Sequence, residues 1–322
     1  MLVFSRVAGD PSTTYLIMTA SFTLAHLSDV HLAPVTGFSP RYWNAKRALG
    51  FLNWQRTRRA VHKRTIADRL VADVLALRAD HIAITGDLIN LGLPAEYNAA
   101  LQWLGRVGPP DRVTVVPGNH DIYTRLHGHG GVMRWAAYMG SEEQSLAFPF
   151  VRRLGQIALV GLNSAVETPP FVAAGQLGAH QIEVAGDLLD QLKSEGAVRV
   201  VMIHHPPLPG LANARRGLRD AAHFARMLEI HGAELVLYGH NHREKIDWHV
   251  TAHSVDAAPI PVIGVPSASA GRLHKHEPLA RYNMFTFFHG ASGVRIRHAV
   301  RGIETPDGPV VKISETVLDA KS

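Results

Sequence analysis

The sequence has 322 residues, of which 46% are hydrophobic and 19% charged, with a formal net charge of +6 and 20 histidines. This apolar content is enough for a buried core and excludes a wholly disordered chain. The absence of cysteine excludes disulfides, cysteine-ligated zinc and thiol catalysis, and is compatible with a reducing compartment. The positive charge favours an anionic partner, and the many histidines direct attention to metal ligands.

The first residues do not resemble a secretion signal, because Arg6, Gly9, Asp10 and Pro11 interrupt their short apolar runs. No stretch approaches the roughly 18 consecutive apolar residues that a membrane-spanning helix needs. We therefore expect residues 1–20 to be a disordered or leader segment, and the protein to be cytoplasmic, with peripheral contact to a membrane as an alternative.

Several short segments rich in Val, Ile and Leu end abruptly in polar residues, which is typical of buried strands. These segments are 22–31, 81–88, 112–121, 157–164, 198–206, 234–242 and 261–269. Helical patterns lie between several of them, over 65–78, 95–106, 180–194 and 219–231. The alternation predicts an α/β fold. We expect one domain over 21–302, mostly β from 246 onward, followed by a C-terminal tail over 303–322.

One segment between the first strand and the first long helix, residues 37–64, is both basic and aromatic. It contains eight Lys or Arg residues, no acid and five aromatic rings. It follows the first polar cluster directly, so we expect it to overhang that cluster as a cap. Three interpretations remain open: aromatic rings packed on the body, recognition of a phosphorylated substrate, or contact with an anionic membrane surface. The sequence contains no dedicated nucleic-acid-binding motif.

The polar clusters that follow the predicted strands would meet where α/β sheets bind their ligands, at the carboxyl ends of the strands. They contain Asp29, His31, Asp87, Asn119, His120, Asp121, His204, His205, His240 and His242. In extended chain, residues two apart point the same way, so Asp29-x-His31 and His240-x-His242 can each face one ion. The ligands outnumber what one ion accepts, which predicts two ions bridged by one carboxylate. We expect His127 and His129 in a loop near this site.

The ordered blocks Asp29-Val-His31, Gly86-Asp87, Gly118-Asn119-His120-Asp121, His204-His205 and Gly239-His240-Asn241-His242 resemble those of the calcineurin-like metallophosphoesterase superfamily. Single blocks are common in proteins, whereas the complete set over residues 29–242 is highly specific. The resemblance implies that residues 21–302 form a metallophosphoesterase domain. Its fold would be a four-layer α-β-β-α sandwich with two mixed β-sheets and a dinuclear metal site at the strand ends.

The resemblance also implies a role for each residue of the blocks. Asp29, His31 and His242 would bind the first metal, Asn119, His204 and His240 the second, and Asp87 would bridge both. Asn119 and His120 would contact the substrate phosphate, with a cationic His120 protonating the leaving oxygen and Asp121 orienting His120. The two divalent cations, Mn, Fe, Zn or also Mg, would lower the pKa of a shared water so that a bridging hydroxide attacks the phosphorus.

Three functions fit this resemblance, and the two enzymatic ones act on a small phosphorylated substrate. The preferred one is hydrolysis of a phosphodiester in a small cyclic nucleotide, because the length and motifs are similar to those of class III cyclic-nucleotide phosphodiesterases. The second is hydrolysis of the pyrophosphate of UDP-2,3-diacylglucosamine, which the basic aromatic segment 37–64 favours. The third is a non-catalytic interaction module, against which the intact Asn119-His120-Asp121 argues. The resemblance also leads us to expect a homodimer.

Overall fold

The computed structural model describes residues 19–37, 39–124, 130–140, 147–250, 259–290 and 293–318. Residues 1–18 of the expected leader lie outside this part of the chain, as do His127 and His129. Thr19 and Ala20, which the expected leader included, instead begin the first strand, β1 (Thr19–Leu27).

Two six-stranded sheets form the centre of the described chain. The first has the order β12-β11-β10-β1-β2-β3. Besides β1 it contains β2 (His81–Ile84), β3 (Val113–Val115), β10 (Arg281–Gly290), β11 (Gly293–Ile303) and β12 (Val310–Leu318). Strands β1, β2 and β3 are parallel, whereas β10, β11 and β12 continue from β1 in antiparallel pairs. This sheet is therefore mixed, as predicted.

The second sheet has the order β4-β5-β6-β7-β9-β8. Its strands are β4 (Phe150–Leu154), β5 (Ile157–Gly161), β6 (Val198–Met202), β7 (Leu235–Tyr238), β8 (Lys245–His249) and β9 (Ile260–Gly264). The four central strands are parallel and the two edge strands pair antiparallel. The second sheet is mixed as well.

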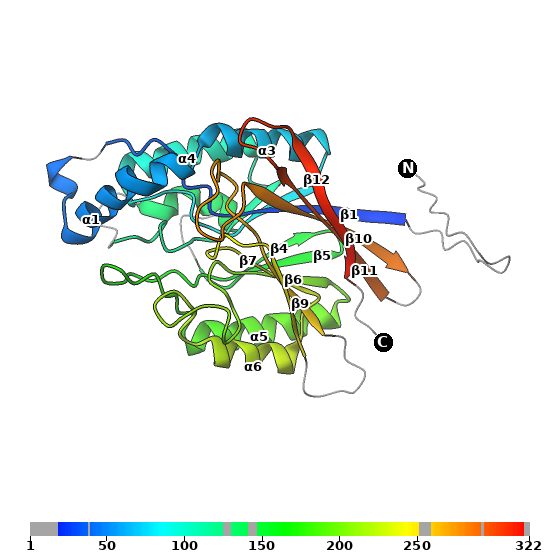
Figure 1. Cartoon of the computed structure of the whole chain (residues 1–322). Helices are drawn as coiled ribbons and strands as arrows, with labels where there is room; N and C mark the ends of the chain where they lie inside the picture. The colour runs from blue at the N-terminus through cyan, green and yellow to red at the C-terminus, as the bar shows by residue number, and fades with distance from the viewer. Residues whose placement is uncertain are drawn as a thin grey trace.

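Helices cover the outer face of each sheet (Figure 1). On the first sheet lie α3 (Arg64–Ala76) and α4 (Pro94–Val107), with the 3₁₀ helix η3 (Gly131–Met139) beside α4. On the second lie α5 (Ala179–Ser194) and α6 (Ala221–His231). The layers thus follow one another as α-β-β-α, which confirms the predicted four-layer sandwich.

Two apolar clusters hold the layers together. Leu159 and Val200 of the second sheet belong to the cluster that also contains the first sheet and the inner faces of α3 and α4. Their neighbours in sequence, Val160 and Val201, belong to the cluster shared with α5 and α6. Successive side chains of a strand point to opposite faces, so a strand between two covered faces must be apolar at every position. This requirement explains the continuous apolar runs in the sequence.

We expected the C-terminal segment 303–322 to be a tail, but its described part, to residue 318, belongs to the fold. Strand β12 pairs with β11 and adds an edge to the first sheet. Arg301 of β11 binds Asp73 of α3 through two hydrogen bonds of 2.7 and 2.9 Å, and Tyr282 donates to the same carboxylate at 2.5 Å. The predicted domain boundary at residue 302 is therefore too early. The sequence did not reveal β12 as a strand because few of its residues are buried and apolar.

The segment 37–64 is mainly helical. It contains the 3₁₀ turn η1 (Pro40–Tyr42), α1 (Ala45–Asn53), the π-helical turn η2 (Trp54–Arg58) and α2 (Arg59–Val61). The Asn44 side chain caps α1 by accepting from Arg47 N at 2.8 Å. The buried Arg47 guanidinium donates to the carbonyls of Leu91 and Gly92, which ties the segment to the body. Helix α1 lies at the left of Figure 1, on the side of the molecule opposite β10, β11 and β12.

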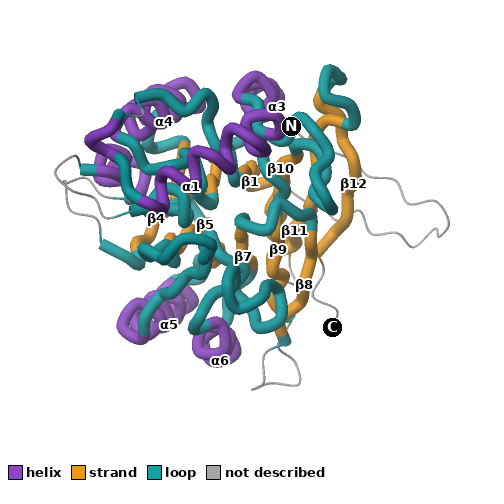
Figure 2. The backbone as a smooth tube through the Cα atoms, turned by 60° about the vertical axis from the view of Figure 1, so that its left-hand side comes forward, coloured by secondary structure: helices purple, strands orange, loops and turns teal. Residues whose placement is uncertain are grey.

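Figure 2 turns that side forward and shows α1 lying across the front of the molecule. None of the helices in the described ranges has the length and apolar character needed to cross a bilayer.

Candidate metal centre

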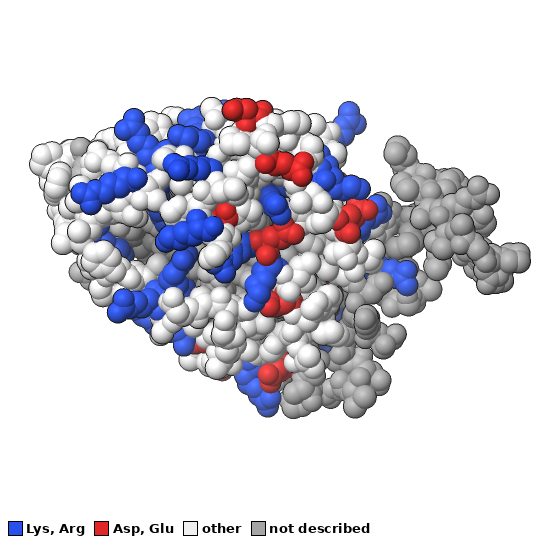
Figure 3. Space-filling model, in the orientation of Figure 1, with Lys and Arg blue, Asp and Glu red and all other residues white. Residues whose placement is uncertain are grey.

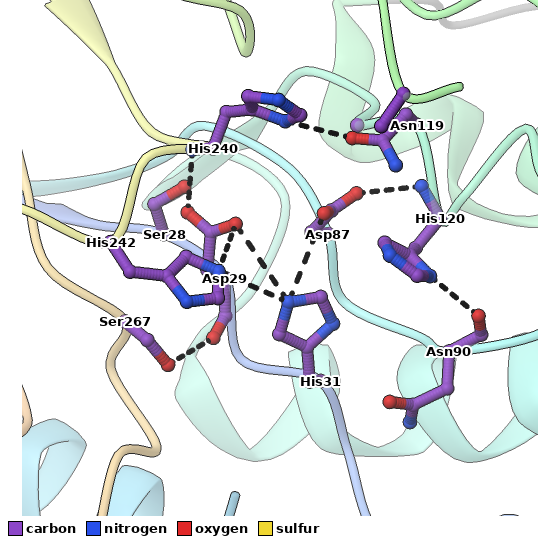
Figure 4. Close-up of polar contacts among 12 residues, drawn as sticks. Ser28, Asp29, His31, Asp87, Asn90, Asn119, His120, His240, His242 and Ser267 are labelled. Carbon is purple, nitrogen blue, oxygen red and sulfur yellow. Dashed lines mark hydrogen bonds and ion pairs between the residues drawn. The ribbon is translucent and has the colours of Figure 1, made fainter. Parts of the chain in front are cut away.

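The side chains predicted as metal ligands converge, but they come from both sheets. Asp29 and His31 follow β1, Asp87 follows β2, and Asn119 follows β3, all in the first sheet. The remaining three ligands, His204, His240 and His242, follow β6 and β7 of the second sheet. Figure 4 shows the labelled members of this set pointing into one space. The centre therefore lies where the carboxyl ends of two stacked sheets meet.

The first group of donor atoms consists of Asp29 Oδ1, His31 Nε2 and His242 Nε2. The carboxylate oxygen lies 3.1 Å from His242 Nε2 and 3.8 Å from His31 Nε2, and the two nitrogens are 3.4 Å apart. All three side chains are buried. They form one of the buried His and Asp groups of the described chain whose geometry suits a metal ion.

The second group consists of Asn119 Oδ1, His204 Nε2 and His240 Nδ1. The amide oxygen is 3.2 Å from His204 Nε2 and 2.9 Å from His240 Nδ1, and the two nitrogens are 3.2 Å apart. Asp87 Oδ2 lies between the groups, 3.8 Å from His31 Nε2 and 3.4 Å from His204 Nε2. One carboxylate oxygen is therefore within reach of both sets of donors.

These distances and donor types fit two metal ions. Donor atoms bound about 2.1 Å from one ion lie about 3.0–3.4 Å from one another, close to the separations in both groups. Imidazole nitrogens combined with carboxylate and amide oxygens suit Mn, Fe or Zn.

The outer nitrogens of three histidines fix which ring atom faces the centre. His31 Nδ1 donates to Ile89 O at 3.2 Å, and His204 Nδ1 donates to Thr85 O at 2.6 Å. His242 Nδ1 lies 3.0 Å from the Glu277 carboxylate. We assign the proton to Nδ1 in each, because an oxygen acceptor faces that atom. With metal bound, the Nε2 lone pairs would then point inward, as in the carboxylate– or carbonyl–histidine–metal arrangements of metalloproteins.

The protein's own charges make the centre attract positive charge. Burial lowers the pKa of His204, but the nearby Asp87 carboxylate outweighs it and raises that pKa to about 9. The pKa of His242 is likewise about 9, because Asp29 and Glu277 outweigh burial. Burial would raise the pKa of Asp87, yet the imidazoles around it hold the value well below the usual range. The carboxylates are therefore ionised and stabilised by positive charge beside them, which the imidazoles supply and which metal ions would supply when bound.

The backbone is strained where the ligands are presented. Five of the candidate ligands have φ between 43° and 66°, in the left-handed region that non-glycine residues avoid: Asp29, His31, Asp87, His240 and His242. They account for five of the eight such residues in the described chain. Strain of this kind costs about 1–3 kcal/mol per residue and persists where function requires it. Its concentration here supports a functional centre.

Two glycines allow the strand ends to approach closely. A β-carbon on Gly118 would lie 2.2 Å from Asp87 Oδ1, and one on Gly239 would lie 1.9 Å from Ser28 Oγ. Both distances are far shorter than atoms tolerate, so any larger residue would displace the ligands beside these glycines. The glycines that precede candidate ligands in the sequence thus have a steric explanation.

His120 lies beside the two groups and is held by its backbone and its ring. Its N–H donates to Asp87 Oδ1 at 2.7 Å, and its Nδ1 donates to Asn90 O at 2.6 Å. The ring stacks on Tyr123, with centroids 5.3 Å apart. Burial, and then the Arg58 guanidinium, lower the pKa of His120 to about 3. The cationic form expected from the sequence therefore requires a neighbouring negative charge, such as a phosphate.

The Asp121 carboxylate makes no hydrogen bond to the His120 ring, contrary to the expectation that it orients this residue. Its Oδ2 accepts from Asp87 N and Gly118 N at 2.8 and 2.9 Å. Its Oδ1 accepts from the N–H groups of Leu88 and Ile89. Asp121 thus holds the loop that carries Asp87, and the Asn90 carbonyl orients His120. A backbone carbonyl leaves no signature in a sequence, so this contact could not be predicted.

Further histidines and arginines lie around the predicted ligands without belonging to either donor group. His205 contacts Ser164 Oγ at 2.8 Å and Ala173 O at 3.2 Å and so supports the loop beside His240. His62 and Arg58 of the segment 37–64, together with Arg216, for which no role was predicted, line a cavity of about 340 Å³ above the ligands. Arg58 Nη1 is 3.4 Å from His120 Nδ1, but Nδ1 is itself a donor, so this contact is not a hydrogen bond. The segment 37–64 therefore does overhang the centre.

Comparison with known proteins agrees with this geometry. The chain is 29% identical over 174 residues to a glycerophosphodiester phosphodiesterase, GpdQ, of Enterobacter lignolyticus, covering 51% of this chain and 56% of the relative. It is 30% identical over 168 residues to a probable cyclic nucleotide phosphodiesterase of Synechococcus, covering 51% and 58%. The chain thus spans little more than half the length of these relatives.

Solved structures show the same fold at low identity. A dimetal phosphatase of Danio rerio aligns with a TM-score of 0.58 and 13% identity, over 93% of this chain and 99% of that chain. A purple acid phosphatase of yellow lupin, Lupinus luteus, aligns with a TM-score of 0.52 and 12% identity, over 93% and 54%. The family model described as calcineurin-like phosphoesterase matches residues 22–244, most of the chain. The resemblance seen in the sequence is confirmed: the chain belongs to the calcineurin-like phosphoesterase family.

Proposed function

We propose that the protein hydrolyses a phosphodiester with two divalent metal ions, and that its preferred diester is a small cyclic nucleotide. The observation that carries this proposal is the position of Asp87 Oδ2, within 3.8 Å of a donor nitrogen of each group. Asp29, His31 and His242 would hold one ion and Asn119, His204 and His240 the other, with Asp87 shared. Two ions this close are typical of enzymes that cleave phosphate esters.

When bound, the two ions supply an acidic water at neutral pH and neutralise phosphate oxygens. The chain's own residues would do the rest. Arg58 and Arg216 line the cavity and would bind the remaining phosphate charge. His120, with Nδ1–H held by Asn90 O, would carry a second proton on Nε2 once the phosphate is bound and deliver it to the leaving oxygen.

A diester is favoured because the two relatives named above are both described as phosphodiesterases. A second candidate is the pyrophosphate of a lipid-linked nucleotide such as UDP-2,3-diacylglucosamine. The exposure of Trp43 next to the basic residues of the segment 37–64 favours it, since this surface suits an anionic membrane. Figure 3 shows Lys and Arg side chains gathered on the side of the molecule that carries α1.

A substrate panel tests the proposal. The protein is stripped with a chelator, reloaded separately with Mn, Zn, Fe or Mg, and assayed on a model diester, a model monoester, 3′,5′-cyclic AMP and UDP-diacylglucosamine. We expect diester hydrolysis that returns only with metal, and turnover of cyclic AMP. Preference for the monoester would contradict the proposal, and turnover of the lipid nucleotide alone would favour the second candidate. Inactivity with every metal would favour a non-catalytic module.

A further inference from the structure

A second cavity of about 360 Å³ adjoins the one above the metal ligands. The two share Asn53, Arg58, Asn119, His120, Ala173 and Arg216 in their walls. Away from this common wall, the second cavity is lined mainly by apolar and aromatic side chains: Leu49, Trp54, Leu91, Tyr123, Phe171 and Val172. A ligand can therefore occupy both cavities at once, with its charged part at the metal ligands and an apolar part beyond His120.

The position of His120 relates the second cavity to the reaction. If His120 protonates the leaving oxygen, the group attached to that oxygen lies on the same side as His120. His120 and its stacking partner Tyr123 both line the second cavity. The alcohol half of a bound diester would therefore extend into this space, while the phosphate stays beside Arg58 and Arg216.

The charges of this cavity are confined to the wall that it shares with the metal side and to one lysine. Lys46 Nζ already donates to Thr168 O at 2.7 Å and lies 4.6 Å above the Tyr123 ring. Trp54 is buried, and its indole Nε1 has no hydrogen-bond partner within the described protein. This atom is inaccessible from the cavity, so Trp54 contributes to the wall through the carbon atoms of its ring. The cavity thus offers a largely apolar, ring-binding surface.

Phe171 at the edge of this cavity is presented by a fixed loop. Its side chain is 82% exposed and its φ is 65°, which is strained for an aromatic residue. The loop is held on both sides: Thr168 Oγ1 donates to Val172 O at 2.6 Å, and Ala173 N donates to Arg215 O at 2.8 Å. The ring lies in the cavity wall on a strained loop held by hydrogen bonds, where it is well placed to contact a ligand.

The volume limits what the cavity can hold. Pockets for small molecules span about 300–1,000 Å³, so this one is near the lower end. It matches one ring system or a nucleoside-sized group and is too small for a pair of acyl chains. The aromatic side chains around it favour a flat ring over a compact polar alcohol such as glycerol.

We propose that this second cavity is a leaving-group subsite that selects phosphodiesters whose leaving alcohol carries a flat, apolar ring. The inference rests on the proposed function, because it takes the phosphate to be bound at the metal ligands. It adds that Phe171, Leu49 and Trp54 determine which diester is used.

Two synthetic diesters test the inference: phenyl methyl phosphate and 2-naphthyl methyl phosphate. Phenol and 2-naphthol have similar acidity, so the two leaving groups have similar intrinsic reactivity and differ mainly in ring size. We expect kcat/KM of the metal-loaded enzyme to be about tenfold or more higher for the naphthyl ester, mainly through a lower KM, because more apolar surface is buried. Equal kcat/KM values would overturn the inference and leave the proposed function intact.

Phe171→Ala and Leu52→Ala form the matched pair of variants. Phe171→Ala should lower the naphthyl-to-phenyl ratio of kcat/KM at least about fivefold. Leu52 is 45% exposed on the same segment but lines neither cavity, so Leu52→Ala should keep the wild-type ratio. An unchanged ratio in Phe171→Ala would contradict the role of this residue.

A binding measurement separates the two proposals. Calorimetric titration of the metal-loaded protein with 2-naphthol, the released alcohol, requires no catalysis. We expect binding that is weakened at least about fivefold in Phe171→Ala and unchanged in Leu52→Ala. If neither diester is hydrolysed but 2-naphthol binds in this way, the proposed function and the leaving-group role both fail, and the cavity stands only as a ring-binding site. If 2-naphthol does not bind the wild-type protein, the subsite is wrong.

Discussion

The two cavities beside His120 are built in different ways. Around the metal ligands, polar atoms are held by hydrogen bonds from loops in left-handed conformations, and the ligands come from both sheets of the sandwich. The second cavity is formed largely by side chains of the helical segment 37–64 and of the loop that carries Phe171. The first arrangement would not tolerate small shifts, whereas the second can change its side chains without moving the sandwich.

This difference indicates a division of roles. The requirements for cleaving a phosphate ester are the same whatever alcohol is attached, so they belong to the rigid centre. The requirements for choosing the alcohol vary, and a segment inserted after the first strand can meet them. Variants of the metal ligands should therefore affect all substrates alike, variants of His120 should depend on the acidity of the leaving group, and variants in the second cavity should depend on its shape.

Asp87→Asn should have the largest effect. It keeps an oxygen to accept from His120 N, so the fold should persist, but it removes the charge shared by both donor groups. Because loss of a contact behind a metal ligand already costs about 10–100-fold, we expect a loss of more than about 100-fold in kcat/KM on every substrate. Metal content by mass spectrometry should fall too. The control is the same substitution at Asp187, which is exposed on α5 and should change neither quantity. Normal metal content and turnover in Asp87→Asn would contradict the shared-ligand role.

His120→Ala should come next and should depend on the leaving group. Loss of a general acid costs about 10²–10⁴-fold when the leaving alcohol is basic, and much less when the leaving group is an acidic phenol such as p-nitrophenol. Metal content should stay normal, and exposed His180→Ala provides the control. Equal losses of kcat with both kinds of leaving group would argue that His120 only binds the phosphate.

Asp121→Ala tests the support of the centre. Removing the acceptor of several buried N–H groups should lower the free energy of unfolding by about 3 kcal/mol, measured by urea denaturation. Turnover of the folded fraction should fall without the leaving-group dependence of His120→Ala. If Asp121→Ala instead showed that dependence at normal stability, Asp121 would orient His120 directly, as the sequence resemblance implies.

Leu49→Ala should have the smallest effect. Leu49 is 40% exposed and lines only the second cavity, so its truncation should cost little stability. We expect about a threefold rise in KM for the naphthyl diester, because part of one apolar contact is lost. A comparable effect on kcat for every substrate would remove the distinction between the two cavities.

The sequence by itself determined the α/β layers, the family and the identity of the side chains that converge. Buried strands must be apolar at every position, and metal ligands must be particular residue types placed directly after them, so both leave patterns that can be read locally. The cap position of the segment 37–64 was also predictable, because the segment follows Asp29 and His31 in the chain.

Only the tertiary structure decided how these parts meet. It showed that Asp87 stands between ligands from two different sheets, that the Asn90 carbonyl and not Asp121 holds His120, and that β12 completes the first sheet. It also revealed the cavity between α1 and the Phe171 loop. Backbone carbonyls are the same in every residue, edge strands need few apolar side chains, and a cavity is formed by segments far apart in the chain; none of these has a local sequence signal.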